Sequence, residues 1–140
     1  MKNLALLLIC FICFQYANAQ DSTRTYSITV TMNKVLSSQG HILIGLHDQN
    51  TFMKGKGIKN AKADITDGKC IYTFTDVTPG VYAIMVLHDA NDNEKMDFAE
   101  NGMPIENYGV SNNRMNFGPP QFYDAKFEVI DQDLELEIKF

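Results

Sequence analysis

Tryptophan is absent from this 140-residue sequence and cysteine is scarce, with Cys10 and Cys13 near the N-terminus and Cys70 as the third. The missing Cys–Trp–Cys pattern argues against the core of an antibody-type domain. If the N-terminal segment is removed, Cys70 is left alone and no intramolecular disulfide can form. Cys70 shares a predicted strand face with Tyr72 and Phe74, so we expect its thiol to be buried and unreactive.

Long apolar runs are also missing, except for one at the N-terminus from Leu4 to Phe14. This run is too short for a transmembrane helix, which needs about 20 residues. A basic residue precedes it and Ala17-Asn18-Ala19 follows, the small-x-small pattern of a signal peptidase site. We therefore predict a cleavable signal peptide over residues 1–19, a mature chain that starts at Gln20, and secretion to the periplasm or the extracellular space without a membrane span.

Basic residues are fewer than acidic residues. The chain has 12 Lys and Arg against 17 Asp and Glu, a net charge of −5 that becomes −6 once Lys2 leaves with the leader. This balance disfavours nucleic acids and anionic membranes as partners. Residues 20–140 have the length of a single domain.

Helical periodicity is missing after the leader, and alternation of apolar and polar residues dominates instead. Residues 81–87 are apolar on both faces, which predicts a central strand. The pattern predicts an all-β fold, an antiparallel β-sandwich of about seven strands of an immunoglobulin-like or transthyretin-like kind. The strands are expected at residues 26–32, 42–46, 61–66, 70–75, 81–87, 125–129 and 134–140.

The polar segment 89–120 is predicted as one long loop, far longer than most connections in compact domains. Its first part has the oxygen-ligand spacing of a calcium loop, although Glu94 stands where such loops carry glycine. The alternative is a solvated turn in which the side chains bond their own backbone. The candidate ligands of Ca²⁺ are Asp89, Asn91, Asn93, Lys95 through its carbonyl, Asp97 and Glu100.

Catalytic motifs are lacking, so we expect a protein that is not an enzyme and has no cofactor besides a possible Ca²⁺. No serine lies in a Gly-x-Ser-x-Gly motif. His47 and His88 each precede an aspartate at a predicted strand end. If these ends met, His47, His88 and Asp89 could hold a transition metal, and a small metal-dependent hydrolase is the alternative function.

Aromatic residues are concentrated late in the polar segment and just after it. They could form a platform for a carbohydrate or a peptide, or they could pack the loop against the sandwich. These residues are Tyr108, Phe117, Phe122 and Tyr123.

Several motifs together resemble the bacterial secreted proteins grouped as domain of unknown function 2141. The resemblance rests on segments 76–84, 88–93, 107–113 and 118–125, which span nearly the whole mature domain. It implies a β-sandwich in a bacterial envelope or extracellular setting, and it implies no reaction. The family pattern has glycine at the position of Glu94, so we expect the calcium site to be weaker here.

These observations favour a secreted, non-enzymatic binding module. Its partner is expected to be an envelope or extracellular protein or glycan.

Overall fold

The computed structural model describes residues 24–114 and 118–140. The predicted signal peptide, residues 1–19, and Phe117 lie outside the described residues. The elements are β1 (Tyr26–Asn33), β2 (His41–His47), β3 (Lys59–Ala63), β4 (Lys69–Val77), β5 (Gly80–Asp89), β6 (Tyr108–Val110), η2 (Ser111–Asn113), α2 (Phe122–Ala125), β7 (Phe127–Val129) and β8 (Leu134–Ile138).

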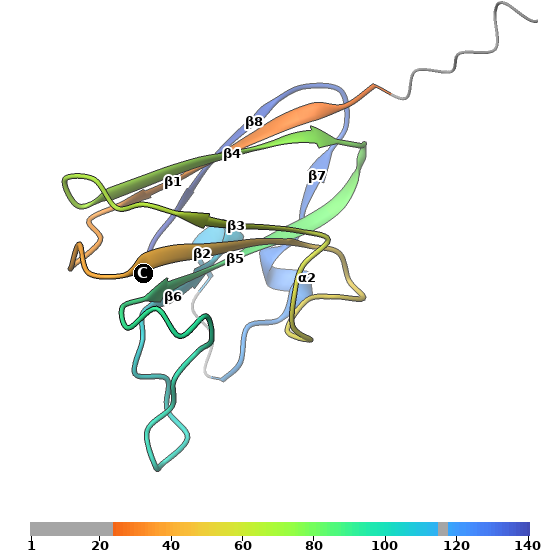
Figure 1. The fold of residues 1–140 in the computed structure, drawn as a ribbon. Coiled ribbons are helices and arrows are strands. Elements are labelled where there is room, and N and C mark those ends of the chain that lie inside the picture. Colours follow the sequence, from red (N-terminus) through yellow and green to blue (C-terminus); the bar gives the residue numbers. More distant parts are fainter. Residues whose placement is uncertain (1–23, 115–117) are drawn as a thin grey trace, which may run out of the picture.

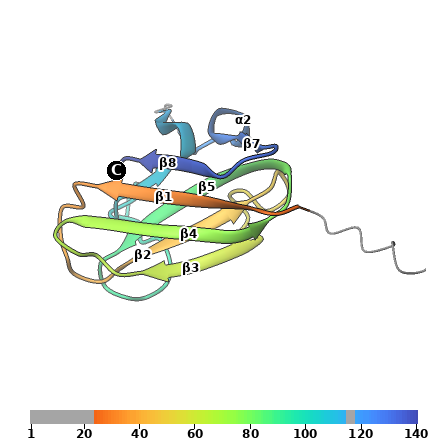
Figure 2. The same cartoon turned by 90° about the horizontal axis from the view of Figure 1, so that it is seen from above.

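The strands form two sheets that lie face to face, as Figure 1 and Figure 2 show. One sheet has the order β4-β1-β8 and the other the order β3-β2-β5-β6, with β7 paired to the start of β5. The predicted all-β sandwich is confirmed. β3 lies at a sheet edge, and β5 lies inside its sheet, as the apolar residues 81–87 predicted.

The core follows from the alternation along each strand, because every second side chain points between the sheets. Ile28, Val30 and Met32 of β1 are fully buried there and belong to the same apolar cluster as Ile84 and Val86 of β5. The opposite face of β5 is apolar too, and it contributes to a second, smaller cluster beside α2. That cluster consists of Phe52, Ala83, Val110 and Ala125.

Two details differ from the prediction of a wholly antiparallel sandwich with one long loop. β8 runs parallel to β1, with Ile28 opposite Leu134 and Met32 opposite Ile138. Alternation shows which side chains share a face but contains no information on strand direction.

The segment 89–120 is also not one loop, because it contains the three-residue strand β6 and the short helix η2. A strand this short has too few alternating positions to be recognised in a sequence.

Candidate functional site

The predicted calcium loop forms the base of a hairpin that projects from the β3-β2-β5-β6 sheet (Figure 1). We refer to residues 89–107 as the acidic hairpin. At its neck the His88 N–H donates to the Asn107 carbonyl over 2.8 Å. Farther out, the Ile105 N–H donates to the Asp97 carbonyl over 3.0 Å. The predicted ligands thus lie on a structured excursion between β5 and β6.

Asp89 anchors the first turn of the acidic hairpin and is fully buried, at 0% exposure. Its Oδ1 accepts the Asn93 N–H over 3.0 Å and its Oδ2 accepts the Glu94 N–H over 2.9 Å. A buried carboxylate is tolerated only with such partners. The Asp89 side chain therefore holds the backbone wrapped around it.

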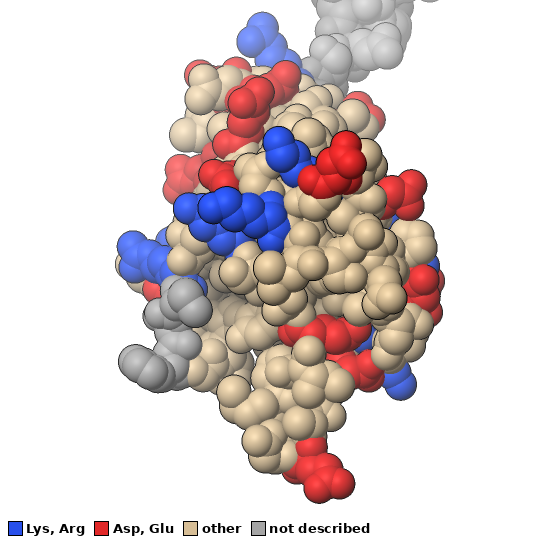
Figure 3. Space-filling model, turned by 90° about the vertical axis from the view of Figure 1, so that its left-hand side faces the viewer, with Lys and Arg blue, Asp and Glu red and all other residues tan. Residues whose placement is uncertain are grey.

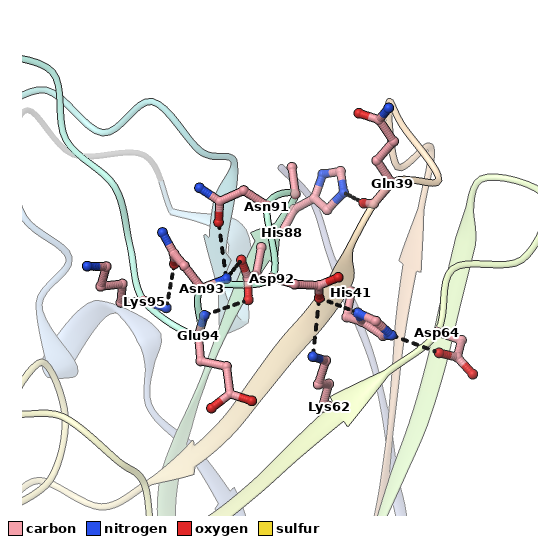
Figure 4. A network of polar contacts seen from close by, with 12 residues as sticks. Gln39, His41, Lys62, Asp64, His88, Asn91, Asp92, Asn93, Glu94 and Lys95 are labelled. Carbon is pink, nitrogen blue, oxygen red and sulfur yellow. Dashed lines mark hydrogen bonds and ion pairs between the residues drawn. The ribbon is translucent and has the colours of Figure 1, made fainter.

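The side chains of Asn91, Asn93 and Asp97 meet at one point. Asn91 Nδ2 and Asn93 Nδ2 each donate to the same atom, Asp97 Oδ2, over 2.7 Å. The amide oxygens of the two asparagines accept the N–H groups of Asn93 and Lys95, so both side chains are oriented by the backbone (Figure 4). Since an amide oxygen has two lone pairs, one remains for a cation.

Glu94 has φ of 60°, the left-handed conformation that calcium loops usually assign to glycine. The sequence departs from the family pattern at this position, yet the backbone adopts the expected turn. A non-glycine residue there costs about 1 kcal/mol, and the hydrogen bond from the Glu94 N–H to Asp89 helps to offset it.

Two predicted ligands lie outside this meeting of side chains. Glu100 is exposed on the outer part of the hairpin, and Lys95, predicted to bind through its carbonyl, donates its N–H to Asn93 Oδ1 in the same turn. Glu106 was missed by the spacing argument because it lies beyond the twelve-residue loop. Its carboxylate accepts the Ala90 N–H over 3.1 Å and the Asp97 N–H over 3.2 Å, joining the two strands of the hairpin.

The oxygen donors fit a hard cation such as Ca²⁺, which accepts both amide and carboxylate oxygens. In the described part of the chain, no group of three or more His, Cys, Asp or Glu side chains is arranged to hold a metal ion. The set here consists of one carboxylate and two amide groups, which now meet that carboxylate through their nitrogens and whose oxygens are the atoms that could bind a cation. It suits Ca²⁺ better than a transition metal, which prefers imidazole or thiolate.

A cluster of charged residues holds the acidic hairpin against β2 and β3 (Figure 4). Asp92 Oδ1 contacts His41 Nδ1 of β2, and Lys62 Nζ of β3 lies 3.2 Å from the same oxygen. The hydrogen bond to His41, and then that to Lys62, hold the pKa of Asp92 below its usual 3.8. Sequence reasoning missed this cluster because its members are joined only by the pairing of β2 with β3 and β5.

The alternative site built from His47, His88 and Asp89 is wrong in its geometry. In the antiparallel pair of β2 and β5, His47 lies opposite Ala83, whereas His88 lies opposite Ile42 at the other end. His88 Nε2 contacts the Gln39 carbonyl over 2.9 Å, and His47 packs edge-on against Phe52. The two histidines therefore cannot share a metal.

Cys70 is buried, and burial, together with the charge of Asp64, raises its pKa to about 11. The predicted burial is confirmed. A thiol with this pKa stays protonated at neutral pH and is a poor nucleophile.

Three of the four predicted aromatic residues are described, and they take different positions. Phe122 is half-buried, with its ring centroid 5.7 Å from that of Phe52. Tyr108 lies on β6, where it pairs with Leu87. Tyr123 of α2 is 77% exposed. Packing therefore explains Phe122, and Tyr123 is left available to a ligand.

A comparison with known protein families identifies the family of this chain. The family model described as "Uncharacterized protein conserved in bacteria (DUF2141)" matches residues 30–137, which include the acidic hairpin and strands of both sheets. The chain belongs to the DUF2141 family.

This DUF2141 chain is also similar to three solved structures of the pilus-presented adhesin Spy0125 (Cpa). Sequence identity is 15% in each case, and the TM-scores are 0.29, 0.27 and 0.25. The matches cover 86%, 83% and 86% of this chain but only 27%, 27% and 28% of the adhesin chains. No curated protein matches the DUF2141 chain. Among the described residues, no helix is long and apolar enough to cross a membrane.

Proposed function

We propose that this DUF2141 protein is an exported, non-enzymatic binding module whose acidic hairpin engages an envelope or extracellular partner, with Ca²⁺ bound at the base of the hairpin. The observation that carries the calcium part is the meeting of Asn91, Asn93 and Asp97 at one point above the buried Asp89. A cation there would bind Asp97 Oδ2 in place of the two amide N–H groups that now donate to it, and the amide oxygens of Asn91 and Asn93 would be its further ligands. Its charge would offset the surrounding carboxylates.

The shape of the hairpin supports a binding role. Phe98, Met103 and Ile105 are exposed apolar residues on its outer part. In Figure 3 the hairpin is the projection at the bottom, mostly uncharged with acidic groups near its tip. Exposed apolar side chains gathered on one projection are typical of interaction sites.

Calorimetric titration with CaCl₂ tests the calcium site, alongside melting curves in CaCl₂ and in EGTA. We expect a dissociation constant of about 0.1–1 mM, as in extracellular calcium modules, and a higher melting temperature with Ca²⁺. Asp97→Asn should weaken binding about tenfold or more, since a full negative charge is lost. The matched control Asp131→Asn alters an exposed carboxylate outside the hairpin and should bind as the wild type does.

Absence of both heat and a melting shift at millimolar Ca²⁺ would exclude the metal. The acidic hairpin would then be a turn held by its own hydrogen bonds.

A further inference from the structure

A groove lies at the end of the β2–β5 pair opposite the acidic hairpin. It has a volume of about 540 Å³ and is formed by the turn after β2, the start of β5 and the segment around α2. In Figure 1 this region is on the right, where the chain after β2 passes close to α2. Its lining includes Asp48, Asn50, Gln121, Tyr123 and Lys126.

The turn on one side of the groove is held in place by Asp48. Asp48 Oδ1 accepts the N–H groups of Asn50 (3.0 Å) and Thr51 (2.8 Å) and the Thr51 hydroxyl (3.0 Å). These hydrogen bonds, first among them that from the Thr51 N–H, lower the pKa of Asp48 below its usual 3.8, so it is ionised at neutral pH. The bonds use Oδ1, which leaves Oδ2 as an acceptor for a ligand.

The other side of the groove is equally well supported. Asn112 Nδ2 donates to the carbonyls of Asp124 (3.0 Å) and Lys126 (2.9 Å), which fixes the chain around α2. The edge-on contact of Phe52 with Phe122 ties the two sides together. A groove whose walls are held this firmly needs little reorganisation to bind a ligand.

The lining selects a ligand that is polar but uncharged. Asp48 and Lys126 have opposite charges, so the charges of the lining favour neither a cation nor an anion. The amides of Asn50 and Gln121 both donate and accept hydrogen bonds, as sugar hydroxyls do. Lys126 Nζ lies over one face of the Tyr123 ring, 4.6 Å from its centroid, and the side chain is 77% exposed. The ring can therefore stack on the C–H face of a pyranose through its other face.

We propose that this groove binds a neutral saccharide, with one pyranose ring stacked on Tyr123 and its hydroxyls bonded by Asp48, Asn50 and Gln121. A peptide is the less suitable occupant. Extended peptides gain affinity by pairing with a strand edge, and this groove is lined mainly by side chains of turns and of α2. The proposal goes beyond the acidic hairpin and does not depend on Ca²⁺.

NMR tests whether the groove binds a saccharide. The ¹⁵N-labelled protein is titrated, in EGTA, with cellotetraose and with chitotetraose. β-Linked sugars are used because their equatorial hydroxyls leave flat C–H faces. We expect saturable shifts of the amides of residues 48–51 and 121–126 at sugar concentrations up to about 20 mM. Tyr123→Ala should weaken binding about tenfold, and Asn50→Ala about fivefold.

Tyr108→Ala is the matched control, since it removes a partly exposed tyrosine from β6, outside the groove. It should leave saccharide binding unchanged. The proposal is overturned if neither saccharide gives saturable shifts, or if Tyr123→Ala binds as the wild type does. Saturable shifts with tetraalanine alone would assign the groove to a peptide instead.

Discussion

Glu94 and Asp92 both have positive φ, at 60° and 58°, within three residues of each other. Side chains other than glycine rarely hold this conformation, because Cβ approaches the following carbonyl. The acidic hairpin maintains it through Asp89, which bonds the Glu94 backbone, and through His41, which bonds the Asp92 side chain. The turn is thus stabilised by its contacts and not by intrinsic preference.

Replacing Glu94 with glycine should stabilise the protein slightly. Relief of the left-handed strain is worth about 1 kcal/mol, and the greater freedom of glycine in the unfolded chain removes roughly half of that. Urea unfolding should show a net gain of about 0.5 kcal/mol. Lys95→Gly is the matched control, and it should lose about 1 kcal/mol because Lys95 has no positive φ to relieve. An equal loss in both variants would contradict this account of Glu94.

His47 predicts a pH dependence of stability. It is 4% exposed, its Nδ1 has no hydrogen-bond partner, and burial lowers its pKa from 6.5, an effect that the Thr51 backbone and Asp48 only partly offset. Below pH 6.5 the unfolded chain binds a proton that the folded chain does not. The free energy of unfolding should therefore fall as the pH drops from 6.5 toward the lower folded pKa, and stay level below it.

Urea unfolding at pH values from about 7.5 to 5 measures this slope. Asp48 and Asp92 have pKa values lowered from 3.8, so their contributions are lost only in more acidic solution. His47→Gln should flatten the slope between pH 6.5 and 5. An unchanged slope in this variant would assign the effect to other groups.

For individual residues, the sequence predicts contacts between side chains that are close together along the chain. The spacing of Asn91, Asn93 and Asp97 is local, and the structure brings these side chains together. The parts that it could not predict, His41 and Lys62, belong to other strands. Their positions depend on strand register, which one-dimensional spacing does not contain.

Among the elements, η2 and α2 are joined to β5 by one buried hydroxyl, that of Ser111. The Ile84 N–H donates to Ser111 Oγ over 2.9 Å, and the Ser111 hydroxyl donates to the Ala125 carbonyl. Ser111 is fully buried. It thereby joins the sheet to the segment that lines the saccharide groove.

Ser111→Ala should destabilise the protein by about 3 kcal/mol, because two buried backbone groups lose their partners. Urea unfolding followed by circular dichroism measures the change. Ser38→Ala, at an exposed position, should stay within about 0.5 kcal/mol of the wild type. A loss below about 1 kcal/mol in Ser111→Ala would mean that water takes over both bonds.

The long strands were predictable because each has enough alternating positions to show its buried face. The central place of β5 followed from its two apolar faces. The sequence predicted a strand that begins at Ala125. In the structure, Ala125 is instead the last residue of the single helical turn Phe122–Ala125. The edge strand β3 spans Lys59–Ala63 instead of 61–66, since the ends of short strands are set by their partner, here β2.

For the whole molecule, export is the property with the most direct test. The leader pattern predicts that bacteria expressing the full chain will yield a mature protein beginning at Gln20, found outside the cytoplasm. Intact mass spectrometry of the periplasmic and extracellular fractions measures this. Ala19→Trp should prevent cleavage, because the peptidase accepts only small residues there. Wild-type protein that keeps residues 1–19 would refute the signal peptide.

The parallel pairing of β1 with β8 determines when the sheet that contains them can be completed during synthesis. Of the strands in the described residues, β1 is synthesised first and β8 last, yet the two are neighbours from Ile28 to Met32. One side of β1 stays open until residues 134–138 have emerged from the ribosome, and such distant pairing is slow to form. Until then the nascent chain remains incompletely folded. Chaperones have that interval in which to engage it.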